Sequence, residues 1–333
     1  MHRISNKYNM VVPISQSSKT AARSDMSGKH NEAGIVAEVM GENASPEIRE
    51  MYETNERKLM ELQDEPGSDT AKQIIERNRQ INKQIAKQCI DKIKQLGGTP
   101  LVLTSNDMQL SRGETIADTA RVMSRYVDAV MIRAQSHKTL LEFKENSEIP
   151  IINGLTNVSH PCQIMADIMT IQENFNCIEG LNISWFGDSN NVLKSWIDAA
   201  TKFKFNLRIA SPKGYQPNQK LIKMATDSGA QINLYEDSHK AALDADVLIT
   251  DVWISMGDEE GTRLEDLKPY QVNSKLLELA HSDAIFLHCL PAIRGNEVTE
   301  DVIDGPQSKV IEEAENRLHA QKAILCHLFN YKI

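Results

Sequence analysis

The segment 283–295 combines an apolar run with residues that could do chemistry. It reads Asp-Ala-Ile-Phe-Leu-His-Cys-Leu-Pro-Ala-Ile-Arg-Gly, and the run ends abruptly at His288. Buried parallel strands have such runs, and their carboxyl ends open onto the ligand crevice of an α/β sheet. Pro291 lacks a backbone donor and ends the strand. The pattern predicts that His288, Cys289 and the Leu290 carbonyl face a crevice, although an ordinary strand end with a buried cysteine also fits.

Two further segments place cationic or polar side chains at the ends of expected elements. Arg133 ends the run Asp-Ala-Val-Met-Ile-Arg, and His160-Pro-Cys-Gln163 opens a helix. A helix amino end favours an anion, and a histidine there can donate to a developing oxyanion. Taken alone, each residue fits a capping or pairing role better, since most polar residues at element ends satisfy backbone groups.

Two more strand ends carry groups suited to an amino acid. Gly187-Asp-Ser-Asn-Asn191 lacks the Gly-x-Gly-x-x-Gly spacing of a dinucleotide site, so its amides suit a carboxylate or amino group. Plain turn chemistry remains the alternative. Asp251-Val-Trp-Ile-Ser255-Met256-Gly follows the apolar run 247–250, so Asp251 could hold an ammonium group while the turn holds the other end of the ligand.

From Thr99 onward, expected strands alternate with expected helices, and these elements must position the residues above. This βαβα pattern predicts parallel sheets covered on both faces. The expected strands are 100–104, 128–133, 150–155, 182–186, 207–210, 232–235, 247–251 and 284–289. The expected helices are 114–126, 137–146, 161–176, 191–203, 217–228, 274–280 and 307–328. The helix 161–176 is expected to link the two sheets, with a ligand between them.

The segment before Thr99 has a different composition. Residues 1–68 contain no Phe or Trp and show no strand pattern, so we expect a poorly ordered tail followed by some helix. A long helix is expected over 69–96, ended by Gly97-Gly98.

Composition limits the class of protein. Of the 333 residues, 41% are hydrophobic and 25% are charged, as in globular proteins, and the net charge of −9 argues against nucleic acid as the main partner. No apolar run approaches the length of a membrane span. The five cysteines show no paired spacing, which favours a reduced, cytoplasmic protein with free thiols.

Taken together, the motifs resemble the aspartate/ornithine carbamoyltransferase family from about Gln95 to the C-terminus. The resemblance rests on motifs that occur in the family order: Asp-Thr-Ala-Arg (118–121), His-Pro-Cys-Gln (160–163), Gly-Asp-x-Asn-Asn-Val (187–192), Asp-x-Trp-x-Ser-Met-Gly (251–257), His-Cys-Leu-Pro (288–291) and Glu-Asn-Arg-Leu-His (315–319). Ser-Met-Gly together with His-Cys-Leu-Pro points to ornithine rather than aspartate as the acceptor.

The resemblance implies carbamoyl transfer from carbamoyl phosphate to the δ-amine of ornithine, without metal or cofactor. By the resemblance, the carbamoyl group would be bound by Arg133, His160 and Gln163, and Arg317 would complete the carbonyl site. Ornithine would be held by Asn191, Asp251, Ser255 and Met256. The reacting amines would be oriented by Cys289 and Leu290. It also implies a homotrimer in which Gln109 reaches the site of a neighbouring subunit. The implied parts are a divergent segment (1–68), a carbamoyl-phosphate domain (69–165), an ornithine domain (166–308) and a C-terminal helix (309–333) that packs back on the first domain.

One departure from the family pattern concerns the phosphate. The family grips it with Ser-Thr-Arg-Thr-Arg, whereas the corresponding residues here are Asn82-Lys-Gln-Ile-Ala86. The resemblance therefore predicts an intact ornithine half and an impaired phosphate half. Two alternatives follow: a catalytically inactive binding or regulatory subunit, and a carbamoyltransferase for another amine such as putrescine.

Overall fold

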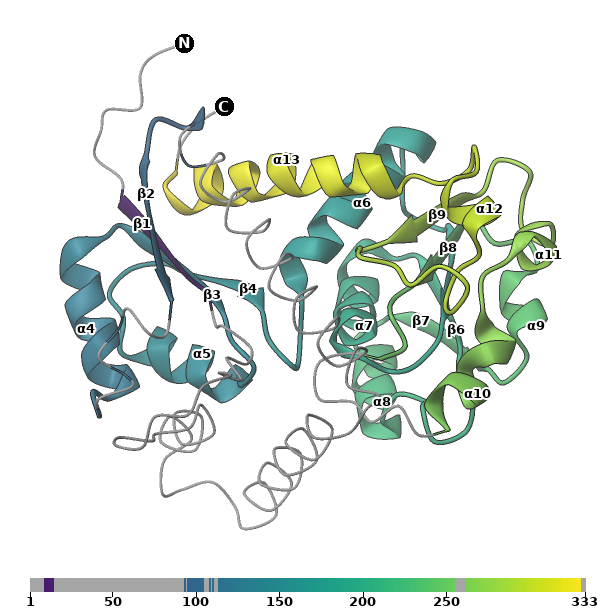
Figure 1. The fold of residues 1–333 in the computed structure, drawn as a ribbon, viewed down its shortest axis with the longest axis horizontal. Coiled ribbons are helices and arrows are strands. Elements are labelled where there is room, and N and C mark those ends of the chain that lie inside the picture. The colour runs from purple at the N-terminus through teal and green to yellow at the C-terminus, as the bar shows by residue number, and fades with distance from the viewer. Residues whose placement is uncertain are drawn as a thin grey trace, which may run out of the picture. The chain divides into compact units, whose positions relative to one another are not determined.

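The computed structural model describes residues 113–254 and 262–330, the backbone of 9–14, and most of 93–110. The chain divides into two compact units, Met1–Thr156 and Asn157–Ile333 (Figure 1). The expected helix 69–96 lies almost entirely outside the described residues.

The first unit contains a four-stranded parallel sheet. Its strands are β1 (Asn9–Ile14), β2 (Thr99–Thr104), β3 (Ala129–Arg133) and β4 (Ile151–Leu155), in the order β2-β1-β3-β4. β1 pairs with β2 from Asn9↔Thr99 to Ile14↔Thr104 and also with β3. The expectation of no strand within residues 1–68 is therefore wrong, because Asn-Met-Val-Val-Pro-Ile forms an inner strand of this sheet.

Helices α4 (Ile116–Tyr126) and α5 (His137–Glu145) connect successive strands of the first unit. The Thr115 hydroxyl accepts from the Asp118 N–H and so caps α4, as expected for a threonine before an apolar-periodic segment. Met123 of α4 and Phe143 of α5 pack with the buried strand residues Val130 and Ile132. This packing fixes the carboxyl end of β3, where Arg133 lies.

The second unit contains a five-stranded parallel sheet in the order β7-β6-β5-β8-β9. Its strands are β5 (Asn182–Phe186), β6 (Asn206–Ala210), β7 (Gln231–Tyr235), β8 (Val247–Thr250) and β9 (Ile285–His288). Its helices are α6 (Pro161–Phe175), α7 (Asn191–Phe203), α8 (Gln219–Asp227), α9 (Ser238–Ala242), α10 (Arg263–Leu267), α11 (Ser274–Leu277), α12 (Glu300–Ile303) and α13 (Val310–Leu328). Both β8 and β9 are buried at every position, which explains their continuous apolar sequences.

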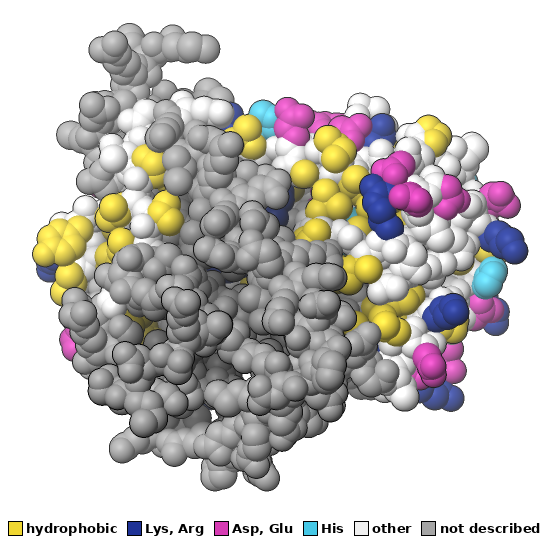
Figure 2. Space-filling view, viewed as in Figure 1, with side chains coloured by type: hydrophobic (Ala, Val, Ile, Leu, Met, Phe, Trp, Pro, Cys, Tyr) yellow, Lys and Arg dark blue, Asp and Glu magenta, His cyan; other side chains and the backbone are white. Residues whose placement is uncertain are grey.

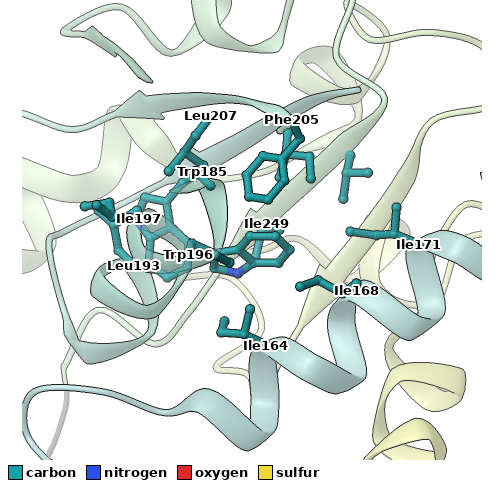
Figure 3. Close-up of a cluster of buried hydrophobic side chains, with 14 of the residues drawn as sticks. Ile164, Ile168, Ile171, Trp185, Leu193, Trp196, Ile197, Phe205, Leu207 and Ile249 are labelled. Atoms are coloured by element: carbon teal, nitrogen blue, oxygen red, sulfur yellow. The ribbon is translucent and has the colours of Figure 1, made fainter. Parts of the chain in front are cut away.

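The core of the second unit lies between its sheet and helices α6 and α7. Trp196 of α7 is fully buried and meets Phe205 edge-on, with ring centroids 5.5 Å apart. Figure 3 shows Ile164 and Ile168 of α6 directed toward this aromatic cluster. Removing a buried aromatic side chain of this kind typically costs about 3–5 kcal/mol, so this core stabilises the packing of α7 and α6 on the sheet.

The strands expected from the sequence agree with the observed strands to within one or two residues, and the expected α/β fold class is confirmed. The short helices α9, α10 and α12 were not expected, because four or five residues give no clear periodicity. Helix α6 belongs to the second unit, where it packs against α13. The expected packing of α13 on the first domain stays a prediction.

The surface of the second unit carries charges of both signs. Figure 2 shows acidic and basic side chains interspersed along the right-hand rim of the view. Among the described residues, no helix combines the length and the apolar character needed to cross a membrane.

Candidate functional site

Three of the sequence motifs meet at one edge of the second sheet. Strands β5, β8 and β9 are neighbours and run parallel, so the segments that follow them leave the sheet on the same side. Gly187, directly after β5, has φ +129°, a conformation that glycine adopts without steric cost. A Cβ at Gly187 would lie 3.5 Å from the Trp253 indole nitrogen, so the glycine also lets two of the motifs approach.

The Asp251 carboxylate is the centre of this edge. Its Oδ2 accepts from Asn190 Nδ2 at 2.6 Å. Its Oδ1 accepts from the Val252 N–H at 2.8 Å and from the Cys289 thiol at 3.1 Å. Asn190 also caps α7, because its Oδ1 accepts from the amides of Val192 and Leu193. Asp251 is therefore a buried anion held at a fixed place by groups from three strand ends.

His288 orders the turn after β9. Its Nδ1 accepts from the Leu290 N–H at 2.9 Å, which assigns the proton to Nε2, and Nε2 lies 3.4 Å from Glu297 Oε1. Leu290 has φ +52°, and the bond to Pro291 is cis. Residues with such unusual φ values cluster at functional sites, where the surrounding structure holds them.

The donor atoms of Asp251, His288 and Cys289 lie within 4.8 Å of one another, a spacing compatible with a metal ion. The hydrogen bonds favour a different interpretation. His288 Nδ1 already accepts from the Leu290 N–H, and the Cys289 thiol donates to Asp251. Burial and the Asp251 charge raise the pKa of Cys289 well above its ordinary value, so the thiol keeps the proton that this hydrogen bond uses. We assign these residues to a hydrogen-bonding set.

His160 is held beside this edge by a hydroxyl of α7. The Ser195 Oγ accepts from the His160 N–H at 2.7 Å and donates to the Asn191 carbonyl at 2.8 Å. His160 is also the residue before α6, with Pro161 at the first helical position, where its missing N–H has no cost. One serine thus fixes the amino ends of α6 and α7 relative to each other.

Helices α6 and α13 contribute a buried polar cluster behind the amino end of α6. Gln163 Nε2 donates to Asp167 Oδ1 and to Glu313 Oε1, both at 2.8 Å. Glu313 Oε2 accepts from the His288 N–H at 2.8 Å, which ties the cluster to β9. Gln163, Asp167 and Glu313 are each at most 2% exposed, so every charge in this cluster must be balanced locally.

The two carboxyl groups of this cluster have raised pKa values. Burial raises the pKa of Asp167 to about 7, although hydrogen bonds from Glu313 and Gln163 and the charge of Arg317 act in the opposite direction. Burial, the Asp167 charge and the hydrogen bond to Asp167 raise the pKa of Glu313 well above its ordinary value. At neutral pH the cluster therefore contains at least one protonated carboxyl group.

Arg317 lies one turn after Glu313 on α13 and is buried at 7% exposure. Without the resemblance, its sequence position indicated a surface residue. Its neighbour Asn316 fixes α13 on α6, since Asn316 Nδ2 donates to Thr170 Oγ1 at 3.0 Å and to Glu173 Oε2 at 2.6 Å. The guanidinium is thereby kept close to both carboxyl groups.

The structure brings together many, but not all, of the residues expected from the sequence. His160, Gln163, Asn191, Asp251, Cys289, Leu290 and Arg317 all lie in the second unit. Arg133 ends β3 of the first unit. Gln109, Ser255, Met256 and the segment Asn82–Ala86 lie outside the described residues.

Sequence reasoning missed Asn190, Asp167 and Glu313 as members of the site. The pairs Gln163/Asp167 and Glu313/Arg317 have i,i+4 spacing, which places each pair on one helix face. In the sequence, the available signal for these site members was a pair of polar residues on a helix face that is otherwise buried.

The protonation of Cys289 gives a direct test of this geometry. Because the thiolate is the nucleophile, the raised pKa of Cys289 predicts slow alkylation by iodoacetamide at neutral pH and faster alkylation as the pH rises. The substitution Asp251→Asn removes the neighbouring charge and should accelerate the reaction. Mass spectrometry of the alkylated peptides measures the rates, and the exposed Cys177 serves as an internal reference.

A ligand bound at this edge of the sheet should slow the modification of Cys289 and leave that of Cys177 unchanged. A Cys289 rate that is the same with and without the candidate ligand would show that Cys289 does not face its site.

Comparison with known proteins agrees with this architecture. The model of the carbamoyl-P binding domain of aspartate/ornithine carbamoyltransferase matches residues 92–173, and the model of the Asp/Orn binding domain matches residues 179–328. The chain belongs to the aspartate/ornithine carbamoyltransferase family.

Individual relatives point to one branch of this family. Ornithine carbamoyltransferase of Bradyrhizobium diazoefficiens is 57% identical over 239 residues, covering 72% of this chain and 78% of the relative. The crystal structure of ornithine carbamoyltransferase from Campylobacter jejuni is 40% identical, with a TM-score of 0.70 and 74% and 84% coverage. The ornithine carbamoyltransferase structure from Pyrococcus furiosus is 48% identical, with a TM-score of 0.70 and 73% and 80% coverage.

Proposed function

We propose that this protein transfers the carbamoyl group of carbamoyl phosphate to the δ-amine of L-ornithine, giving L-citrulline and phosphate. The observation that carries the proposal is the buried Asp251 carboxylate, held by Asn190, Val252 and Cys289 at the edge where three strands end. A desolvated carboxylate of this kind needs a cationic partner, and the ammonium group of an amino acid supplies one. The similarity to named ornithine carbamoyltransferases supports ornithine as that amino acid.

At the ornithine end, Asp251 and Asn191 hold the amino-acid part, with Ser255 and Met256 assigned to the same ligand by their motif. The Cys289 thiol stays protonated because its pKa is raised, so it positions the ligand and does not attack it. Together with the Leu290 carbonyl, it orients the attacking nitrogen. These residues hold ornithine in one orientation, which lowers the entropic cost of bringing its δ-amine to the carbonyl carbon.

At the carbamoyl end, His160, Gln163 and Arg317 act from the second unit, and the family motif assigns Arg133 to the same carbonyl. The δ-amine nitrogen forms a bond to the carbonyl carbon, and the carbonyl oxygen gains negative charge. Cationic and N–H donor groups stabilise that oxyanion. The carbon–oxygen bond to phosphate then breaks, phosphate leaves with the electron pair, and the nitrogen releases a proton.

The proposal includes a homotrimer in which Gln109 of one subunit reaches the site of the next, in a protein that works in the cytoplasm without metal or cofactor. It also includes an impaired grip on the phosphate, because Asn82-Lys-Gln-Ile-Ala86 replaces the arginines and hydroxyls of the family motif.

A citrulline assay on the purified full chain tests the proposed reaction. With saturating carbamoyl phosphate and ornithine, we expect citrulline to accumulate in proportion to enzyme, and phosphate to appear in equal amount. Putrescine in place of ornithine should give far less product, because it has no carboxylate and only terminal amines. Product from putrescine but not from ornithine would identify a carbamoyltransferase for another amine. Absence of product from both would support an inactive binding subunit.

A further inference from the structure

Two acidic side chains, Asp167 and Glu313, meet in the buried cluster between α6 and α13, where none of the roles above requires them. Gln163 Nε2 donates at 2.8 Å to both Asp167 Oδ1 and Glu313 Oε1, so the two carboxyl groups converge on one nitrogen. Two ionised carboxylates this close in a buried site repel each other, and a proton held between them removes that repulsion.

The surrounding charges set the number of protons in this cluster. The charged or titratable groups that act on the two acids are the Arg317 guanidinium, the Asp251 carboxylate and the Cys289 thiol. The His288 contact is made by its backbone N–H. One shared proton leaves one negative charge beside one guanidinium, whereas two ionised carboxylates would leave an uncompensated charge in a buried site.

We propose that Asp167 and Glu313 share one proton and act as positioning residues that fix the orientation of the Gln163 side-chain amide for the carbamoyl group. This inference rests on the proposed function for the identity of the ligand. The shared proton itself is a property of the free protein and can be measured without any substrate.

The orientation follows from hydrogen-bond chemistry. Both carboxyl groups present acceptors to Gln163, so its NH2 must face them and its Oε1 must face away. Within the described part of the chain, the buried Oε1 has no hydrogen-bond donor. An N–H from the carbamoyl group would satisfy it, whereas the methyl group of acetyl phosphate would not. The two acids therefore set a preference for a carbamoyl over an acetyl donor.

Loss of the shared proton should weaken this arrangement. Above neutral pH the second ionisation places two negative charges against Arg317, which draws the guanidinium toward the acids and disturbs Gln163. We expect the affinity for carbamoyl phosphate to fall on the alkaline side, seen as a rise in its KM, while the Kd for ornithine changes less.

The substitution Asp167→Asn tests the proton. An asparagine can accept from Gln163 through its oxygen and donate to Glu313 through its nitrogen, so it mimics the one-proton state at every pH. We expect the alkaline rise in the KM for carbamoyl phosphate to shift by at least one pH unit or to disappear, roughly a tenfold change at the original midpoint. Glu313→Gln serves if the first variant folds poorly, but its NH2 must replace one of the two oxygens that accept from Gln163 Nε2 and the His288 N–H. We therefore expect it to lose the alkaline rise and to have a higher KM at every pH. Asp198→Asn, at an exposed aspartate of α7 outside the cluster, is the control for removal of a carboxylate and should leave the profile unchanged.

Infrared spectroscopy of the substrate-free protein separates this inference from the proposed reaction. A protonated carboxyl group gives a carbonyl band at neutral pH, and a shared proton predicts that each single substitution removes it, since the remaining acid ionises. Survival of the band in either variant, or pH profiles that superimpose on the parent, would overturn the proposal. An assay without citrulline would refute the proposed function alone, because the infrared result does not depend on turnover.

Discussion

Replacement of Asp251 by alanine is expected to abolish measurable ornithine binding. The change removes the acceptor that holds Asn190 and the Cys289 thiol, together with the only negative charge assigned to the ornithine ammonium. Truncating one partner of a buried charge pair typically costs about 2–5 kcal/mol, so the Kd should rise roughly 30-fold or more. Isothermal titration calorimetry of the full chain with L-ornithine measures the effect.

Asp227→Ala on α8 is a matched control for this experiment. Asp227 pairs with Lys223 at an exposed position, so its loss removes a carboxylate without touching the strand ends. Both variants are checked by thermal unfolding before titration. Unchanged ornithine affinity in folded Asp251→Ala would refute the assignment of Asp251 to the ligand.

Steady-state kinetics are expected to show a very high KM for carbamoyl phosphate, a low turnover number and ordinary ornithine binding. The proposed cause is the segment Asn82-Lys-Gln-Ile-Ala86, which by the family resemblance corresponds to the motif with two arginines and the hydroxyls. Arginine–phosphate bonds contribute roughly 1.5–3 kcal/mol each, so the loss of two weakens binding by on the order of 10²–10⁴-fold. A carbonyl misplaced by about 1 Å also reacts on the order of 10²-fold more slowly.

Lys83 is the one cation in that segment, and Lys83→Ala tests whether it replaces part of the missing grip. A lysine offers a point charge without the two-pronged geometry of arginine, so we expect a further rise in KM that is small beside the effect of the missing arginines. A carbamoyl phosphate KM in the low micromolar range would contradict the prediction and would show that another group holds the phosphate.

The strands were predictable because a buried parallel strand must be apolar on both faces. The runs 129–132 and 247–249 are of this kind, so pattern and structure agree there. β1 was missed because its six residues lie in a polar segment and include Pro13. A proline has no N–H to donate to a neighbouring strand, so Pro13 argued against an inner strand. In the structure, β1 nevertheless pairs with a strand on each side.

The candidate site was predictable where chemistry sits at a strand end, as at Asp251 and Cys289. It was not predictable where it depends on contacts between distant helices. Nothing local to Gln163 indicates that its amide meets Glu313, which is 150 residues away in the chain. The burial of Arg317 has the same origin, since only the packing of α13 on α6 removes that face from water.

The position of Glu313 after Gln163 and His288 in the chain has a consequence for biosynthesis. Until α13 has left the ribosome, the His288 N–H lacks its acceptor and Gln163 lacks one of its two acceptors. Buried polar groups without partners are costly, and domains generally fold as units. During synthesis, the second unit therefore cannot complete this site from its strands alone. The polar cluster becomes ordered only after α13 has emerged, so a chain arrested before α13 would lack the acceptors that Glu313 provides.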